Sequence, residues 1–150
     1  MTTNTMRYEY SDGGRKAAGF KGDASDCGVR ALAIATGISY LEARALIGAQ
    51  AAHEVQAGRG RLAQRPSSAN SGVWVETFHA VMAKLGWRWV PTMAIGSGCT
   101  THLVASELPA GRLIVRLSRH YAAVVDGVVL DTYDPRRDGA RCVYGYWIMK

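Results

Sequence analysis

Residues 120–134, HYAAVVDGVVLDTYD, determine what kind of fold the C-terminal half of this chain can form. Two apolar segments flank an Asp-Gly pair (126–127), and Asp-Gly between β-forming segments is typical of a two-residue β-hairpin turn. With these two residues in the turn, Val125 pairs with Val128 and the register runs outward to His120. The stretch therefore predicts two antiparallel strands, the first of which begins with a histidine.

The same register decides which acidic residue accompanies that histidine. Ala122 faces Asp131 across the hairpin, and side chains two residues apart share a face of a strand. His120 and Asp131 are then diagonal neighbours on one face, within reach of a hydrogen bond between imidazole and carboxylate. Asp134 falls on the other face, and a slip of one residue would exchange the two aspartates. We predict a His120–Asp131 pair, with Asp134 as the alternative.

A second stretch, SDCGVRALAIATG (residues 25–37), predicts a helix that begins at a cysteine. Ser25 and Asp26 are favoured N-cap residues, the following alanines and leucine favour helix, and Thr-Gly is a typical helix end. Cys27 lies in the first turn, where unpaired N–H groups and the helix dipole favour an anion and lower a thiol pKa. The alternative for this stretch taken alone is a buried structural cysteine, which is the commoner role of a lone cysteine.

The rest of the chain predicts an α+β fold in which helices precede an antiparallel sheet. A capping box at Ser39 and Glu42 begins a second helix, and a third is expected over residues 73–86. Between them, residues 53–72 are rich in Gly, Ser and Arg and are predicted to form a long exposed loop. Beyond residue 86 the pattern changes to short segments rich in Val, Ile, Tyr and Trp, which predict strands.

Composition favours a single globular domain spanning residues 1–150. The chain has 150 residues, of which 48% are hydrophobic and 20% charged. No apolar run approaches the length of a membrane span and no hydrophobic leader is present, so we expect no membrane partner and a cytoplasmic location. The net charge of +6 is divided between separate segments and no nucleic-acid module is recognisable, which argues against nucleic-acid binding.

Three cysteines with wide spacing predict neither a disulfide framework nor a paired zinc motif. We interpret Cys99 and Cys142 as small apolar residues. The segment CTTH (99–102) has half of a zinc spacing without a second pair nearby, so no metal is expected. Cys27 remains as the cysteine with a chemical role.

Together, a cysteine at a helix start, a histidine at a strand start and an aspartate on the next strand match the requirements of thiol catalysis. A thiol nucleophile needs a general base, and that base needs a group that orients it. We therefore predict catalytic Cys27, His120 and Asp131, and no cofactor.

The stretches DCGVRALAIATG and HYAAVVDGVVLDTYDP, in this order, resemble papain-like cysteine peptidases. They are especially similar to the bacteriocin-processing (double-glycine) peptidase domains of ABC transporters and to short phage and bacterial proteins with Asp-Cys at a helix start. Some of these end in strands similar to VYGYW (143–147). The resemblance implies a papain-like fold, with Cys27 as nucleophile, His120 as general base and acid, and Asp131 orienting the imidazole. It also implies a protein or peptide substrate cleaved at a peptide, isopeptide or related amide bond.

One departure from that family concerns the oxyanion. The family usually places a Gln or another polar donor several residues before the cysteine, whereas GFKGDASDC (19–27) contains neither Gln nor Asn. Asp23 or Ser25 stands near that position, but an aspartate donates a hydrogen bond only when it is protonated. Backbone N–H groups, including that of Cys27, are the other source of donors.

This departure leaves two alternatives to hydrolysis. The same triad could act as an acyltransferase or deamidase. The fold could also be retained as a non-catalytic binding or structural module, for example in a phage particle, where the protein would be associated with the virion.

Overall fold

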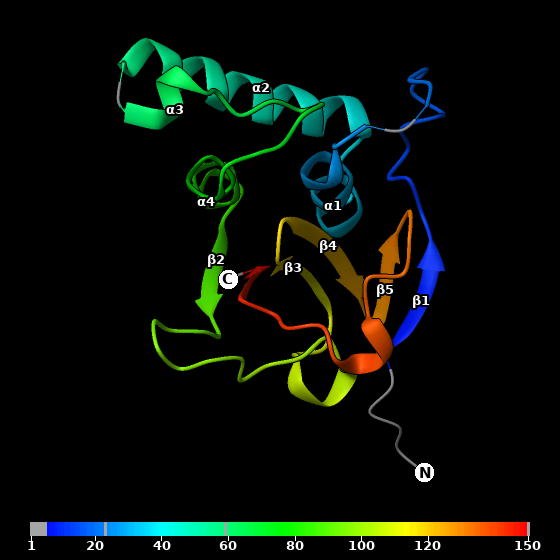
Figure 1. Ribbon diagram of the computed structural model, residues 1–150. Coiled ribbons are helices and arrows are strands. Elements are labelled where there is room, and N and C mark those ends of the chain that lie inside the picture. The colour runs from blue at the N-terminus through cyan, green and yellow to red at the C-terminus, as the bar shows by residue number, and fades with distance from the viewer. Residues whose placement is uncertain (1–5, 23, 59, 150) are drawn as a thin grey trace.

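The computed structural model describes residues 6–22, 24–58 and 60–149 and shows an α+β protein in which helices pack on a six-stranded sheet (Figure 1). The α-helices are α1 Cys27–Thr36, α2 Tyr40–Ala57, α3 Gly60–Gln64 and α4 Val75–Lys84. The strands are β1 Arg7–Tyr10, β2 Trp87–Pro91, β3 Arg112–Leu117, β4 His120–Val125, β5 Val128–Asp131 and β6 Gly145–Met149. Two 3-10 turns, η1 Ala105–Glu107 and η2 Arg137–Gly139, complete the regular structure.

The sheet is mixed, with strand order β1-β5-β4-β3-β6-β2. The prediction of a wholly antiparallel sheet is wrong at one edge, where β1 runs parallel to β5 from Arg7 opposite Val128 to Tyr10 opposite Asp131. The side chains of β1 are mostly exposed, so the polar N-terminal segment lacks the apolar alternation that predicts a strand. Its place in the sheet depends on pairing with β5 instead.

The predicted hairpin between β4 and β5 is confirmed. Asp126 and Gly127 have φ angles of 49° and 79°, as a two-residue turn of type I′ requires. The register is the predicted one, with partners Val125–Val128, Val124–Val129 and Ala123–Leu130. It fixes the spacing between the start of β4 and the end of β5.

The first two helices begin as predicted. Helix α1 starts at Cys27 and is closed by Gly37, whose φ of 80° is left-handed. The Ser39 side chain accepts a hydrogen bond from the backbone N–H of Glu42 at 3.1 Å and caps α2. Within the described residues, no helix has the length and apolar composition needed to cross a membrane.

The prediction of an exposed loop over residues 53–72 is wrong for much of that segment, because α2 continues to Ala57 and α3 follows. Glu54 explains the difference, since it is buried rather than solvated. Its carboxylate accepts hydrogen bonds from Thr77 Oγ1 at 2.7 Å and Gln50 Nε2 at 3.1 Å. Polar residues in this part of the chain therefore join α2 to α4, which composition alone does not reveal.

Two apolar cores lie on opposite faces of the sheet, because successive side chains of a strand point to opposite sides. The face under the helices buries Phe78 of α4 against Tyr121 and Trp147, with the Phe78 and Tyr121 rings stacked at 4.4 Å between centroids. The other face buries Leu103 and Val143 against alternate residues of β3, β4 and β5. Helix α1 is thus held against β4 by one of these cores.

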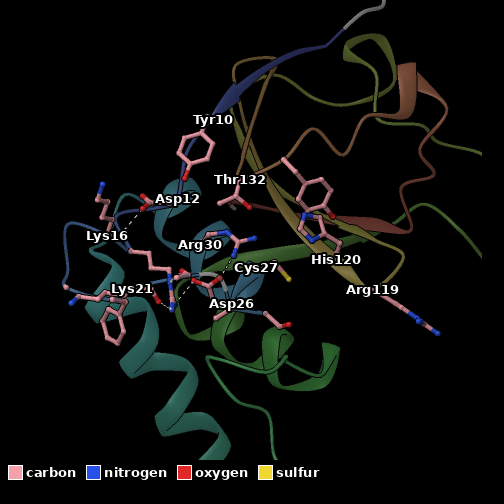
Figure 2. A pocket seen from close by; sticks show the side chains of 17 residues that line it. Tyr10, Asp12, Lys16, Lys21, Asp26, Cys27, Arg30, Arg119, His120 and Thr132 are labelled. Atoms are coloured by element: carbon pink, nitrogen blue, oxygen red, sulfur yellow. Dashed lines mark hydrogen bonds and ion pairs between the residues drawn. The ribbon is translucent and has the colours of Figure 1, made fainter.

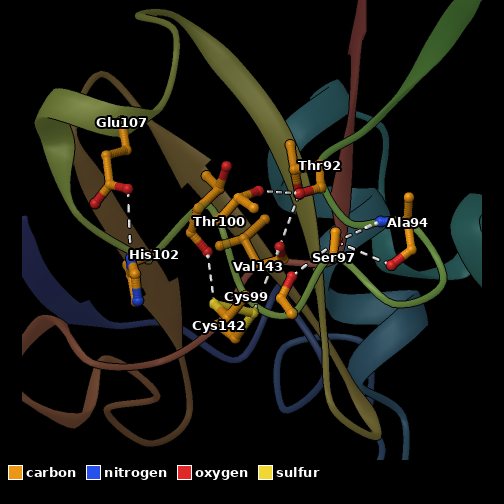
Figure 3. The surroundings of a disulfide bond; sticks show 11 residues. Thr92, Ala94, Ser97, Cys99, Thr100, His102, Glu107, Cys142 and Val143 are labelled. Atoms are coloured by element: carbon orange, nitrogen blue, oxygen red, sulfur yellow. Dashed lines mark hydrogen bonds and ion pairs between the residues drawn. A yellow bond between two sulfur atoms is a disulfide. The ribbon is translucent and has the colours of Figure 1, made fainter.

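Cys99 and Cys142 form a disulfide, which corrects their interpretation as small apolar residues (Figure 3). The sequence separates them by 43 residues, but backbone hydrogen bonds bring their segments together. Leu103 N–H donates to Arg141 O at 2.9 Å, and Val143 N–H donates to Thr101 O at 2.8 Å. This pairing joins two irregular segments, so sequence spacing could not predict it.

Candidate active site

The start of α1, the start of β4 and the end of β5 bring Cys27, His120 and Asp131 together. His120 Nε2 lies 2.5 Å from Asp131 Oδ2, and the two side chains are only 6% and 3% exposed. Figure 2 shows Cys27 and His120 next to each other in one pocket. Asp134, the alternative partner, instead binds Arg136 at the surface, with Oδ2 and Nη2 2.8 Å apart. The predicted choice of Asp131 is therefore the one that the structure shows.

The imidazole of His120 lies between a carboxylate and a thiol. Because Nε2 is bound to Asp131, Nδ1 is the ring nitrogen left to interact with the Cys27 thiol. Burial lowers the pKa of His120, but the hydrogen bonds and charges of Asp131 and Cys27 outweigh it and raise this pKa to about 9. Burial raises the pKa of Cys27, but His120, the Tyr121 N–H and the charge of Arg30 bring it below its ordinary value. Both shifts favour a thiolate–imidazolium pair.

Asp131 is held from several sides. The backbone N–H of Thr132 donates to Oδ1 at 2.7 Å, and Nη2 of Arg30 lies 3.5 Å from the same oxygen. The hydroxyl of Tyr8 donates to the main-chain oxygen of Asp131 at 3.1 Å. Each carboxylate oxygen thus has its own partner, which leaves His120 as the sole partner of Oδ2 within the described residues.

Asp26 stands at the N-cap of α1, but its side chain does not cap the helix. Its buried carboxylate accepts hydrogen bonds from Arg15 at 3.3 Å, from the Tyr40 hydroxyl at 2.6 Å and from Arg30. The predicted capping role is wrong, because three donors from different segments take the carboxylate away from the backbone N–H groups. The residue before the candidate nucleophile is consequently the centre of a buried polar cluster.

Arg15 extends this cluster into the segment that precedes α1. Its Nε donates to Gly22 O and its Nη2 to Lys21 O, both at 3.1 Å. These bonds hold the irregular segment 12–22 beside the start of the helix. That segment forms one wall of the cleft in which Cys27 lies.

The cleft has a volume of about 970 Å³ and contains both Cys27 and His120 (Figure 2). Its lining comes from β1, the segment before α1, the start of α1, the β3–β4 turn and the end of β5, namely Tyr10, Asp12, Arg15, Lys16, Gly19, Phe20, Lys21, Gly22, Ala24, Ser25, Asp26, Cys27, Arg30, Arg119, His120, Thr132 and Tyr133. Ser25 is exposed there, and its backbone N–H donates to Asn70 O at 3.1 Å. Asp23, the other predicted oxyanion residue, lies outside the described residues.

Sequence reasoning missed Arg15, Arg30 and Tyr40. The spacing of Asp26 and Arg30, four residues apart on a predicted helix, could have indicated an ion pair. Nothing in the sequence indicated that Arg15 and Tyr40 converge on the same carboxylate, because those contacts depend on how α1 packs on α2 and on the segment before it.

Among the residues that the structure describes, no three His, Cys, Asp or Glu side chains are grouped in a way that could hold a metal ion. Comparison with known proteins finds no family model, no curated protein and no solved structure that matches the chain. A function must therefore follow from the chemistry of Cys27, His120 and Asp131 in their cleft.

Proposed function

We propose that this chain is a thiol hydrolase of the papain-like type that cleaves a peptide, isopeptide or related amide bond. The observation that carries the proposal is the 2.5 Å hydrogen bond between His120 and Asp131, beside a Cys27 whose pKa is lowered by the same histidine. A nucleophile, a proton carrier and a group that orients the carrier are the three parts that such a reaction needs. The order of helix, cysteine, sheet, histidine and aspartate supports the papain-like assignment.

In the proposed reaction the thiolate of Cys27 attacks the carbonyl carbon of the substrate. The carbon–nitrogen bond breaks, and the His120 imidazolium gives its proton to the leaving amine. A thioester with Cys27 remains. Water then attacks the thioester while His120 takes a proton from it, and the carbon–sulfur bond breaks. This releases the carboxylic acid, whose remaining proton passes to solvent, and restores the thiolate–imidazolium pair. Asp131 keeps the imidazole oriented in both half-reactions.

The oxyanion that forms on the carbonyl needs hydrogen-bond donors. The backbone N–H of Cys27 lies at the first position of α1, where helix N–H groups have no partner within the helix. We assign it to the oxyanion, since backbone N–H groups can form such a site. Ser25, whose hydroxyl lies on the same cleft, is the second donor that we assign.

The experiment that tests the proposal is the pH dependence of Cys27 alkylation by iodoacetamide, read by peptide mass spectrometry in the native protein and in His120→Ala. Cys27 is the one cysteine outside the disulfide, so it is labelled without competition. We expect rapid labelling at about pH 6, well below the ordinary thiol pKa of about 8.5, and a shift of the profile to higher pH in the variant. A native profile that matches an ordinary thiol would exclude the proposed function.

The fate of the acyl group is tested separately, with a peptide library in water enriched in a heavy oxygen isotope and with Cys27→Ser as the matched control. Hydrolysis places the heavy isotope in a new carboxylate in the native sample alone. Capture of the acyl group by an added amine, with no heavy carboxylate, would replace hydrolysis by acyl transfer.

A further inference from the structure

The triad is assembled from two layers of the fold, and one side chain connects them at the site. Cys27 belongs to α1, whereas His120 and Asp131 belong to β4 and β5. Arg30 lies one helical turn beyond Cys27, and its side chain is 9% exposed. It extends from the helix that carries the candidate nucleophile to the carboxylate that holds the candidate base.

The guanidinium of Arg30 bridges two buried carboxylates. Its Nη1 donates to Asp26 Oδ1, and its Nη2 lies 3.5 Å from Asp131 Oδ1 (the bond to Asp26 is the dashed line from Arg30 in Figure 2). The Nε of Arg30 is buried and has no hydrogen-bond partner among the described residues. The two carboxylates are therefore the partners that fix how this side chain lies.

Neutralising Asp26 alone does not explain the position of Arg30. Asp26 already accepts hydrogen bonds from Arg15 and Tyr40 on its other oxygen. Unlike the other partners of Asp26, Arg30 also contacts Asp131. Among the described residues, Asp131 has no other cationic partner apart from His120. Arg15 provides a natural comparison, because it binds Asp26 without reaching Asp131.

We propose that Arg30 is a positioning residue that ties Asp131, and through it His120, to the helix that carries Cys27. The inference rests on the proposed function, because it assigns a role toward the proposed triad. A planar guanidinium holds two carboxylates at a fixed spacing through two separate nitrogens, whereas the ammonium of a lysine is a single point charge without that fixed geometry. The positive charge of Arg30 also helps to lower the pKa of Cys27, which agrees with this role.

The test compares Arg30→Lys with Arg15→Lys. The first readout is the NMR signal of the His120 Nε2 proton in its hydrogen bond to Asp131, which does not depend on catalysis. The second is the pH profile of Cys27 alkylation. We expect Arg30→Lys to weaken the NMR signal and to slow alkylation at about pH 6 by about tenfold, a coupling typical of residues within one ion-pair network. Arg15→Lys, the matched control for the NMR readout, should lower the thermal midpoint while leaving the His120 signal unchanged, because Arg15 binds Asp26 without reaching Asp131. Alkylation is compared between the native protein and Arg30→Lys alone, because Arg15 lines the cleft.

A double-mutant cycle separates positioning from stability. In an Asp131→Asn background, Arg30→Lys should have no further effect on alkylation, because the carboxylate through which it acts is gone. An equal effect in both backgrounds would overturn the inference, and so would an unchanged NMR signal in folded Arg30→Lys. Should the lysine variant not fold, Arg30→Gln keeps a planar hydrogen-bonding group without the charge. It is judged by the His120 proton signal alone, because loss of the charge also acts directly on the pKa of Cys27.

The two proposals fail in different ways. A native protein with the His120 proton signal but an ordinary Cys27 profile contradicts the thiol hydrolase, while the NMR comparison still decides whether Arg30 positions Asp131. If Cys27 is reactive in the native protein but the His120 proton signal is the same in Arg30→Lys, the inference about Arg30 is contradicted and the proposed function is not.

Discussion

His120 and Asp131 share one short hydrogen bond, and the identity of the acceptor decides what the imidazole can do. A carboxylate stabilises the imidazolium form by charge as well as by hydrogen bonding, whereas an amide provides the hydrogen bond alone. We therefore expect Asp131 to contribute to the reactivity of Cys27 without touching it, by keeping a positive charge next to the sulfur.

The first prediction concerns the choice between two aspartates. We expect Asp131→Asn to slow Cys27 alkylation at about pH 6 by about ten- to a hundredfold, which corresponds to the loss of a hydrogen bond to a charged group. Asp134→Asn is the matched control, because Asp134 binds the surface residue Arg136, and it should leave the rate unchanged. Equal slowing by both substitutions would show that the His120–Asp131 bond is not what activates the thiol.

The second prediction concerns the pH dependence of the free energy of unfolding. The pKa of His120 is raised from 6.5 to about 9, so its stabilising contribution is complete below pH 6.5 and is lost as the pH rises through 9. The pKa of Cys27 is lowered, so its contribution is also stabilising but has the opposite pH dependence: it is complete above the pKa of the unfolded thiol and is lost as the pH falls. In the native protein the two pH dependences offset each other, because the folded state binds on His120 the proton that it loses from Cys27.

Removing the thiol should expose the histidine's contribution. We expect the unfolding free energy of Cys27→Ala to decrease as pH rises above 6.5, with a steeper slope than in the native protein, since Asp131 still raises the pKa of His120. Chemical denaturation at a series of pH values measures this slope. A steeper slope in the native protein than in Cys27→Ala would contradict a thiolate–imidazolium pair.

Strand β6 lies between β3 and β2 in the sheet. Gly145, the first residue of β6, lies against the side chain of Trp89 in β2. A Cβ atom at this position would overlap the Trp89 ring, which is itself packed on Trp147 with 4.4 Å between ring centroids and on His79 with 4.9 Å. The glycine at this position is therefore required by the neighbouring strand's side chain rather than by backbone conformation.

The third prediction uses two glycines with opposite surroundings. Gly145→Ala should destabilise the fold by about 1–3 kcal/mol, the usual cost of overpacking a filled site. Gly48→Ala, on α2 with nothing within 4 Å of the new Cβ, should stabilise it by about 0.5–1 kcal/mol, because alanine favours helix. Thermal unfolding of both variants measures the difference. Equal effects would mean that β6 and β2 pack differently.

Local sequence predicts those parts of the molecule that neighbouring residues determine. The helix that starts at Cys27, the Asp-Gly turn and the choice of Asp131 follow from helix propensity, turn preference and strand alternation, each over a few residues. Strand β1, the buried role of Glu54 and the partners of Asp26 depend on contacts between distant segments. From composition alone, polar segments of this kind are expected to be exposed to solvent. In the fold, however, the carboxylates of Glu54 and Asp26 are buried and hydrogen-bonded.

The disulfide between Cys99 and Cys142 is the covalent contact of this kind, and it bears on where the protein can work. Disulfides persist in oxidising environments and are rare in a reducing cytosol. The expectation of a cytoplasmic location therefore carries a measurable consequence, since the bond would be open there. Neither cysteine lines the cleft that contains Cys27 and His120.

The fourth prediction follows from that separation. Reduction of the bond should lower the free energy of unfolding by about 3–4 kcal/mol, the loop-closure value for cysteines 43 residues apart, and leave the pH profile of Cys27 alkylation unchanged. Denaturation with and without a reducing agent measures the first effect, and Cys99→Ala/Cys142→Ala, which cannot form the bond, is the control that should not respond to the reductant. A fall in Cys27 reactivity on reduction would show that the bond supports the cleft as well as the fold. An unfolding curve that is indifferent to reductant would mean that the backbone pairing of the two segments holds this side of the sheet without the covalent link.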